Sequence, residues 1–173
     1  GRPLGAAAEP HRQITERVNA VAQQIDADYK DKNPLFIVVL NGAFMFAADL
    51  AKAVTIDCEW AFVRLSSYKG TKSTGTVSQV LGLKDDVEGR HVIVVEDIVD
   101  SGRTMAKFLP ELDVEHPNSV ALATLLFKPD ALKEEITVDY QCFEIPNAFV
   151  VGYGLDYDEL GRNLPDIYSL TGE

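Results

Sequence analysis

Three carboxylates stand within five positions of the chain, directly after an apolar run. Glu96, Asp97 and Asp100 follow the run Val92 to Val95, and the short turn Ser101 to Thr104 comes next. Carboxylates accept hydrogen bonds from sugar hydroxyls and attract magnesium ions. A hydroxyl-rich turn that opens a helix offers unpaired N–H groups with partial positive charge, which bind phosphate. These residue types, in this order, suit a sugar phosphate.

The elements on either side place these groups at the edge of a sheet. The β-branched run Val92 to Val95 is typical of a strand buried on both faces, and Met105 to Leu109 continues as a short helix. Open α/β sheets bind ligands at the carboxyl ends of their strands, where this turn would lie. The alternative is a plain capped helix, with Asp100 or Ser101 as the N-cap and the acids stabilised by the helix dipole.

Alternating strands and helices predict an α/β fold for the whole chain. This alternation indicates a twisted parallel sheet flanked by helices and joined by right-handed crossovers. One polar segment, over residues 66–80, is unusually long for a connection; a solvated surface loop is the alternative to a functional one. The expected strands are Leu35 to Leu40, Cys58 to Leu65, the run from Val92, Ser119 to Phe127, Val138 to Phe143 and Phe149 to Val151, and the expected helices are Ile14 to Tyr29, Phe44 to Ala53 and the one after Met105.

Composition narrows the class of protein. We expect residues 1–173 to form one domain, because this length suits a single core. The chain has 16 basic and 27 acidic residues and a formal net charge of −11, which disfavours binding to nucleic acid or to an anionic membrane. Cys58 and Cys142 lie in no metal-ligand spacing, and the first ten residues lack the apolar region of a signal peptide. We therefore expect reduced thiols and a cytoplasmic location.

The acidic segment resembles a known signature. Hydrophobic residues, Glu-Asp, two aliphatics, Asp, a small hydroxyl residue, Gly, a basic residue and Thr form the phosphoribosyl-diphosphate signature of type I phosphoribosyltransferases. The form Glu96 to Asp100 is similar to that of the 6-oxopurine branch. Further segments resemble the same branch, and together they extend from about residue 35 to residue 170: Val39 to Phe44, Ser66 to Tyr68 with Ser73 to Gly75, Leu126 to Lys128, and Phe149 to Tyr157.

The resemblance implies a purine salvage transferase. Hypoxanthine, with guanine as a second base, would react with 5-phosphoribosyl 1-diphosphate to give the nucleoside monophosphate and pyrophosphate, with Mg²⁺ as cofactor. It also implies a small hood, which we expect from the last two strands and the carboxyl tail, a flexible active-site loop over residues 66–80, and a homodimer or homotetramer.

Roles for the acidic segment follow from the resemblance. Asp100 would be the general acid/base, because it would face N7 of the purine. Glu96 and Asp97 would bind the ribose hydroxyls directly or through Mg²⁺, and their charge would stabilise an oxocarbenium-like transition state. Ser101, Gly102, Arg103 and Thr104 would hold the phosphate.

Two other segments would complete the sugar-diphosphate site. Asn41 and Gly42 would present backbone N–H groups to pyrophosphate, although relatives carry Lys or Arg where this chain has Asn41, which donates hydrogen bonds but carries no charge. An ordinary Asn-Gly turn is the alternative. Ser67 and Tyr68 would fold over the site and exclude water.

The remaining candidates would recognise the base and the diphosphate. Lys128 would donate to the purine O6 and so select a 6-oxo base, Phe149 would stack on the purine, and the backbone of Val150 would contact its Watson–Crick edge. Asp156 would help to hold a second Mg²⁺, and Arg162 would contact pyrophosphate. The alternatives are a turn residue for Lys128, a core aromatic for Phe149, and solvated loop charges for Asp156 and Arg162.

There are three rival functions. Two are less favoured by the sequence, and the third is set aside. Xanthine-guanine and adenine phosphoribosyltransferases are rivals within the enzyme class, but the segment from Phe149 to Asp156 resembles them less. A regulatory protein on the same fold would bind RNA or DNA, and the acidic excess argues against that. A P-loop hydrolase is suggested by Gly70 to Ser73, but the required GxxxxGK[ST] pattern is absent.

Overall fold

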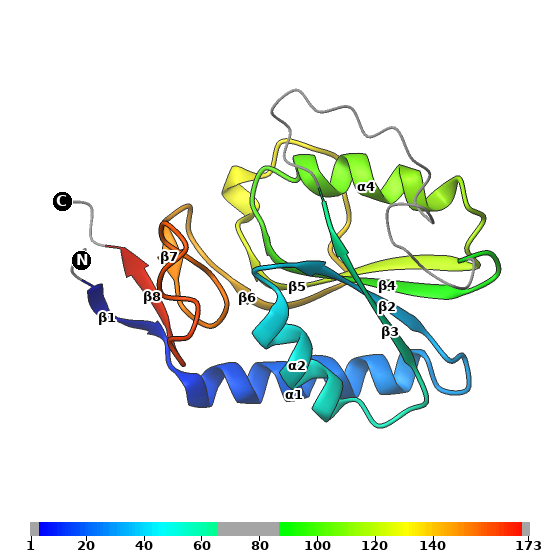
Figure 1. The fold of residues 1–173 in the computed structure, drawn as a ribbon, viewed down its shortest axis with the longest axis horizontal. Helices are drawn as coiled ribbons and strands as arrows, with labels where there is room; N and C mark the ends of the chain where they lie inside the picture. The colour runs from blue at the N-terminus through cyan, green and yellow to red at the C-terminus, as the bar shows by residue number, and fades with distance from the viewer. Residues whose placement is uncertain (1–3, 66–86, 171–173) are drawn as a thin grey trace.

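A five-stranded parallel sheet forms the centre of the molecule (Figure 1). The computed structural model describes residues 4–65 and 87–170. The neighbours in the sheet are, in order, β3 (Glu59–Arg64), β2 (Leu35–Leu40), β4 (His91–Val99), β5 (Ser119–Phe127) and β6 (Tyr140–Glu144), and every pair is parallel. The predicted α/β class with a parallel sheet is confirmed.

Helices cover both faces of this sheet. α1 (His11–Asp28) and α2 (Phe44–Ala53) lie on one face, and α4 (Arg103–Asp113) lies on the other (Figure 1). Ile93 and Val95 of β4 pack with the α1 and α2 side, whereas Val92 and Val94 pack with the α4 side. Successive side chains of a strand point to opposite faces, so an uninterrupted apolar run is required where both faces are covered.

A second, antiparallel sheet forms the hood, with the order β1 (Leu4–Glu9), β8 (Ile167–Leu170), β7 (Val150–Val151). The predicted hood of terminal segments is confirmed, but one assignment was wrong. The strand expected from Val138 belongs to the main sheet as β6, because its apolar residues Tyr140, Cys142 and Phe143 are buried in the main core. The unpredicted β1 pairs with β8 instead, and its sequence LGAAAE has little of the β-branched character that marks strands.

The central strand and helix differ from expectation at their ends. β4 continues to Val99, so Glu96 and Asp97 lie within the strand rather than directly after it. α4 begins at Arg103 and its N-cap is Gly102, so the alternative in which Asp100 or Ser101 is the N-cap residue is wrong. α4 also contains Pro110. The loop expected over residues 66–80, with Ser67 and Tyr68, lies outside the described residues.

Within residues 4–65 and 87–170, we find no helix that combines the length and the apolar character needed to cross a lipid bilayer.

Candidate active site

Three strand ends meet at one edge of the main sheet. Asn41 follows β2, Asp100 follows β4 and Lys128 follows β5. The strands are parallel and in close register, with Val99 opposite Phe127, and the Lys128 amide donates to the Val99 carbonyl at 2.9 Å. The parallel sheet therefore brings Asn41, Asp100 and Lys128 to the same carboxyl edge, where ligands bind in such sheets.

The acidic pair lies at this edge, with Glu96 buried and Asp97 partly buried. Glu96 is only 7% exposed, and burial, followed by the neighbouring charge of Asp97, raises its pKa well above the usual value. Burial also raises the pKa of Asp97. The Asp97 amide donates to a Glu96 carboxylate oxygen at 3.1 Å, and the Ile98 amide donates to Asp97 Oδ1 at 2.7 Å. Two adjacent carboxylates in such a setting are costly unless a cation or hydroxyl donors approach them.

The donor set at this pair fits a magnesium ion that substrate phosphates also coordinate. Among the described residues, no basic side chain forms an ion pair with Glu96 or Asp97. No group of three His, Cys, Asp or Glu side chains within the described ranges suits a metal, so Glu96, Asp97 and Asp156 are not gathered into one cage. Mg²⁺ is commonly held by one or two carboxylates together with substrate phosphates, and this pair meets that requirement.

The turn after β4 leads into the first backbone amides of α4. The Ser101 amide donates to Asp100 Oδ1 at 2.6 Å, and the Arg103 amide donates to Ser101 Oγ at 3.4 Å. The first intrahelical bond runs from Ala106 to Gly102, which leaves the amides of Thr104 and Met105 without an intrahelical acceptor. This arrangement suits a phosphate, because the free N–H groups carry the positive end of the helix dipole.

Gly102 is favoured at this turn by its backbone conformation and by close neighbours. Its φ is 84°, a left-handed conformation that side chains disfavour. A Cβ at this position would also lie 2.9 Å from Leu132 Cδ1 and 3.2 Å from Ile136 Cδ1. The backbone of the phosphate turn is thus packed directly on the segment that follows β5.

Asn41 and Gly42 form a tight turn that touches the acidic pair. The peptide bond that precedes Asn41 is cis, and the Phe44 amide donates to the Asn41 carbonyl at 3.1 Å. A Cβ on Gly42 would overlap the carboxylate of Asp97, so only glycine permits this approach. The Gly42 carbonyl in turn lies against Gly154, where a Cβ would overlap it.

Gly154 and its neighbour Tyr153 are site residues that the sequence analysis missed. The available signal was the pattern Gly152-Tyr153-Gly154, in which two glycines flank a large side chain. Gly152 and Gly154 have φ values of 105° and 99°, so both adopt a conformation that favours glycine. The pattern marks the point where the hood closes on the turn after β2.

Lys128 lies near Phe149, the residue that precedes β7 of the hood. Its side chain is buried at 7% exposure, and its ammonium lies 6.0 Å from the centre of the Phe149 ring. Phe149 is 79% exposed, so the core-aromatic alternative is wrong. Val150 follows at the start of β7 and pairs with Ser169. An ammonium, an exposed ring and a strand edge thus meet at one place.

Asp156 and Arg162 interact with each other rather than only with solvent. Arg162 Nη1 donates to the Gly154 carbonyl at 2.8 Å, and Nη2 lies 3.5 Å from both Asp156 Oδ1 and Glu159 Oε2. The charge of Arg162 also lowers the pKa of Asp97 somewhat against the effect of burial. These residues therefore belong to the same electrostatic environment as the acidic pair.

Comparison with known proteins identifies the family. The model of the phosphoribosyl transferase domain matches residues 7–158. The hypoxanthine-guanine phosphoribosyltransferase of Streptococcus pneumoniae is 43% identical over 164 residues, which cover 94% of this chain and 91% of that protein. The chain belongs to the type I phosphoribosyltransferase family.

Solved structures agree on the fold of this phosphoribosyltransferase. A hypoxanthine-guanine phosphoribosyltransferase from Bacillus anthracis is 38% identical, with a TM-score of 0.86 over 98% of this chain and 100% of that one. The hypoxanthine phosphoribosyltransferase of Trypanosoma cruzi is 34% identical, with a TM-score of 0.88 over 98% of each chain. The resemblance to the 6-oxopurine branch is confirmed, and with it the parallel sheet and the hood of this phosphoribosyltransferase fold.

Proposed function

We propose that the protein transfers a phosphoribosyl group from 5-phosphoribosyl 1-diphosphate to hypoxanthine or guanine, releasing pyrophosphate and IMP or GMP. One observation carries this proposal. A carboxylate pair, with Glu96 buried and Asp97 partly buried, and the amides at the start of α4 occupy the same sheet edge as a buried lysine and an exposed aromatic ring. The first two suit a sugar phosphate, and the last two suit a planar 6-oxo base.

The sugar phosphate would be held from two sides. The turn from Ser101 to Thr104 would bind the 5-phosphate through the Thr104 amide and its hydroxyl donors, while Glu96 and Asp97 would accept hydrogen bonds from the ribose hydroxyls. Negative charge beside the ring would stabilise the positive charge that develops as the glycosidic bond exchanges. Buried carboxylates act strongly here because water does not screen them.

Mg²⁺, when bound, would neutralise charge on the diphosphate leaving group. We propose that Glu96 and Asp97 hold one ion, and that Asp156 helps to hold a second. Gly42 and Asn41 would offer backbone amides to the pyrophosphate, and Arg162 would approach it as a charged donor. Asn41 supplies no charge where relatives have Lys or Arg, so Arg162 and Mg²⁺ would carry more of the attraction.

The base would lie between the hood and the end of β5. Phe149 would stack on the purine ring, and the backbone of Val150 would contact its Watson–Crick edge. Lys128 would donate to O6, which is an acceptor in hypoxanthine and guanine, whereas adenine has a donor at that position. Asp100 would exchange a proton with N7 while the bond to the sugar forms.

We also propose a homodimer or homotetramer in the cytoplasm. Phe62 is 54% exposed on β3, at the edge of the main sheet, and a large exposed aromatic on an edge strand favours burial against another chain. Cys58 and Cys142 are free thiols, and burial raises the pKa of Cys142 to about 12. Such thiols suit a reducing compartment.

A purine panel tests the proposed function. Hypoxanthine, guanine, xanthine and adenine would each be incubated with 5-phosphoribosyl 1-diphosphate, with and without Mg²⁺, and nucleotide formation would be followed by absorbance. We expect turnover with hypoxanthine and guanine, little with adenine, and none after chelation of the metal. Preferential turnover of xanthine or adenine would contradict the assignment, as would a gel shift with RNA or DNA and no turnover.

A further inference from the structure

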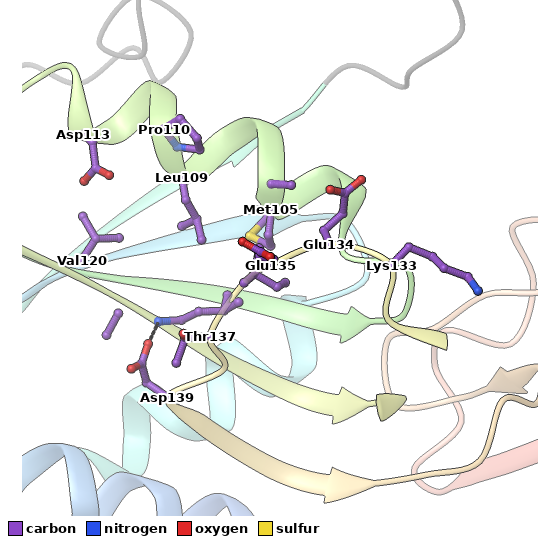
Figure 2. A pocket seen from close by; sticks show the side chains of 14 residues that line it. Met105, Leu109, Pro110, Asp113, Val120, Lys133, Glu134, Glu135, Thr137 and Asp139 are labelled. Atoms are coloured by element: carbon purple, nitrogen blue, oxygen red, sulfur yellow. Dashed lines mark hydrogen bonds between the residues drawn. The ribbon is translucent and has the colours of Figure 1, made fainter. Parts of the chain in front are cut away.

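The connection between β5 and β6 leaves part of the sheet without a covering helix. Parallel neighbours need a crossover, which is usually an α-helix. Here the crossover contains only the short 3-10 helix η1 (Pro129–Ala131), and residues 132–139 run as irregular chain. Beside α4, a pocket of about 730 Å³ lies over β5 (Figure 2). This volume lies within the usual range of small-molecule sites.

The floor and one wall of this pocket are apolar. Met105 and Leu109 come from α4, Val120 and Leu122 come from β5, and Ile136 comes from the irregular segment. Figure 2 shows Met105 and Leu109 directed from the helix towards the strand that carries Val120. None of these side chains can satisfy a polar ligand, so the interior favours a hydrocarbon or aromatic body.

The rim of the pocket is acidic. Asp113, Glu134, Glu135 and Asp139 line it, against a single basic residue, Lys133. In Figure 2 the Lys133 side chain extends away from the other labelled side chains. Asp139 Oδ2 accepts a hydrogen bond from the Leu122 amide at 2.8 Å, and none of the four carboxylates forms an ion pair within the described ranges. Negative charge around an apolar floor is complementary to a cation with an apolar body.

One wall of the pocket also supports the phosphate turn. A Cβ on Gly102 would lie 3.2 Å from Ile136 Cδ1 and 3.5 Å from Glu134 Cβ, and both of these residues line the pocket. The Lys133 amide donates to the Ser101 carbonyl at 2.9 Å. A ligand that moves this wall would therefore act on the backbone of Ser101 and Gly102, through the hydrogen bond from Lys133 and the side chains packed around Gly102.

We infer that this pocket is a regulatory site for a small organic cation with an apolar ring body, and that its occupancy alters the affinity of the phosphate turn for its ligand. The site is separate from the proposed active site, from which the wall at residues 132–136 divides it. The coupling part of this inference rests on the proposed function, because it assigns phosphate to the turn at Ser101 to Thr104.

Calorimetric titration with three matched naphthalene probes tests the binding part. The probes are 2-naphthylmethylamine, 2-naphthylmethanol and 2-naphthoate, which share a ring and differ in charge. We expect the amine to bind with a dissociation constant below about 1 mM and at least tenfold more tightly than the alcohol. Equal affinity for amine and alcohol, tighter binding of the naphthoate, or no binding of the amine would overturn the inference.

Variants locate the binding. Glu134→Gln with Glu135→Gln should weaken binding of the amine about tenfold or more, whereas the control Glu111→Gln with Glu115→Gln, which lies outside the pocket, should leave it unchanged. Thr137→Trp should fill the pocket and abolish binding. If the control variant loses as much affinity for the amine, or if Thr137→Trp binds the amine undiminished, the amine binds elsewhere and the assignment of this pocket is overturned.

The coupling is measured by titrating ribose 5-phosphate with and without saturating amine. We expect its dissociation constant to change about fivefold or more, and the reciprocal experiment to give the same factor. An unchanged constant overturns the regulatory part. Calorimetry needs no turnover, so failure here is distinct from failure of the purine panel, which tests the proposed function.

Discussion

Asp100 is well placed for proton transfer, because its side chain is exposed at the end of β4 while its Oδ1 is oriented by the Ser101 amide at 2.6 Å. Asp100→Asn keeps this acceptor but removes the basic site. We predict that turnover falls about 10²–10⁴-fold, while calorimetry shows that binding of 5-phosphoribosyl 1-diphosphate survives. Near-normal turnover would refute the acid/base role, and Asp130→Asn on the nearby η1 serves as the control.

Lys128 is the residue proposed to select the base. Its buried ammonium can serve a 6-oxo acceptor, and a mismatched buried donor costs about 1–3 kcal/mol. We predict that Lys128→Ala reduces the preference for hypoxanthine over adenine by about 5–150-fold, measured as the ratio of kcat/KM values. An unchanged ratio would contradict the role of Lys128 in base selection. Lys133→Ala is a matched control and should leave the ratio unchanged.

The buried carboxylate of Glu96 lowers the stability of the folded protein when it is ionised. Its folded pKa lies above the ordinary value of 4.5 because of burial, so the folded protein loses stability as the pH rises from 4.5 through the raised pKa. Glu96→Gln keeps the shape without the charge. We predict a higher free energy of unfolding than wild type at neutral pH, no difference below about pH 4.5 and much lower turnover, with urea unfolding measured across this range. A variant that is less stable than wild type at neutral pH would contradict this reasoning.

At the scale of elements, one hydrogen bond ties the hood to α2. Tyr153 is buried, and its hydroxyl donates to the Asp49 carboxylate, with the Met45 carbonyl 3.5 Å away. Burial, and then the bond to Asp49, raise the pKa of Tyr153 above its usual range. The next residue, Gly154, lies against the Gly42 carbonyl. The base-binding hood and the turn after β2 are therefore held in one arrangement.

Removing the Tyr153 hydroxyl tests whether its hydrogen bond to Asp49 positions the hood. We predict that Tyr153→Phe lowers the free energy of unfolding by about 0.5–1.5 kcal/mol and raises the KM for the purine more than it lowers kcat. Asp49→Asn retains an acceptor and should lose less. A fall in kcat alone, or a larger loss for Asp49→Asn, would show that the bond does not position the hood.

At the scale of the whole molecule, the exposed edge of the sheet bears on assembly. β3 ends the main sheet, and Phe62 stands exposed there, while its neighbour Trp60 stacks on Phe36 with ring centres 4.1 Å apart. We predict that Phe62→Glu lowers the mass measured by sedimentation, because a charge would oppose burial at the contact. Val114→Glu changes another apolar residue, 72% exposed, and should leave the mass unchanged. A monomeric wild type, or equal effects of both variants, would rule out this edge as the contact.

The sequence by itself determined the local elements and the chemistry of the acidic segment. The strands Leu35–Leu40 and Ser119–Phe127 and the helix Phe44–Ala53 were predicted with the observed bounds, because periodicity and turn residues act over a few positions. Glu96, Asp97 and Asp100 were recognised from their order along the chain. The single-domain organisation and the individual site roles stay predictions.

Only the tertiary structure decided which distant segments meet. β1 joins the hood by pairing Leu4 with Leu170, a contact between opposite ends of the chain that no local pattern marks. The fit of Gly42 against Asp97 and Gly154, and the raised pKa of Glu96, likewise depend on residues that fold together from separate elements. Burial and close packing are properties of the assembled core, whereas sequence periodicity reports only the face on which a residue lies.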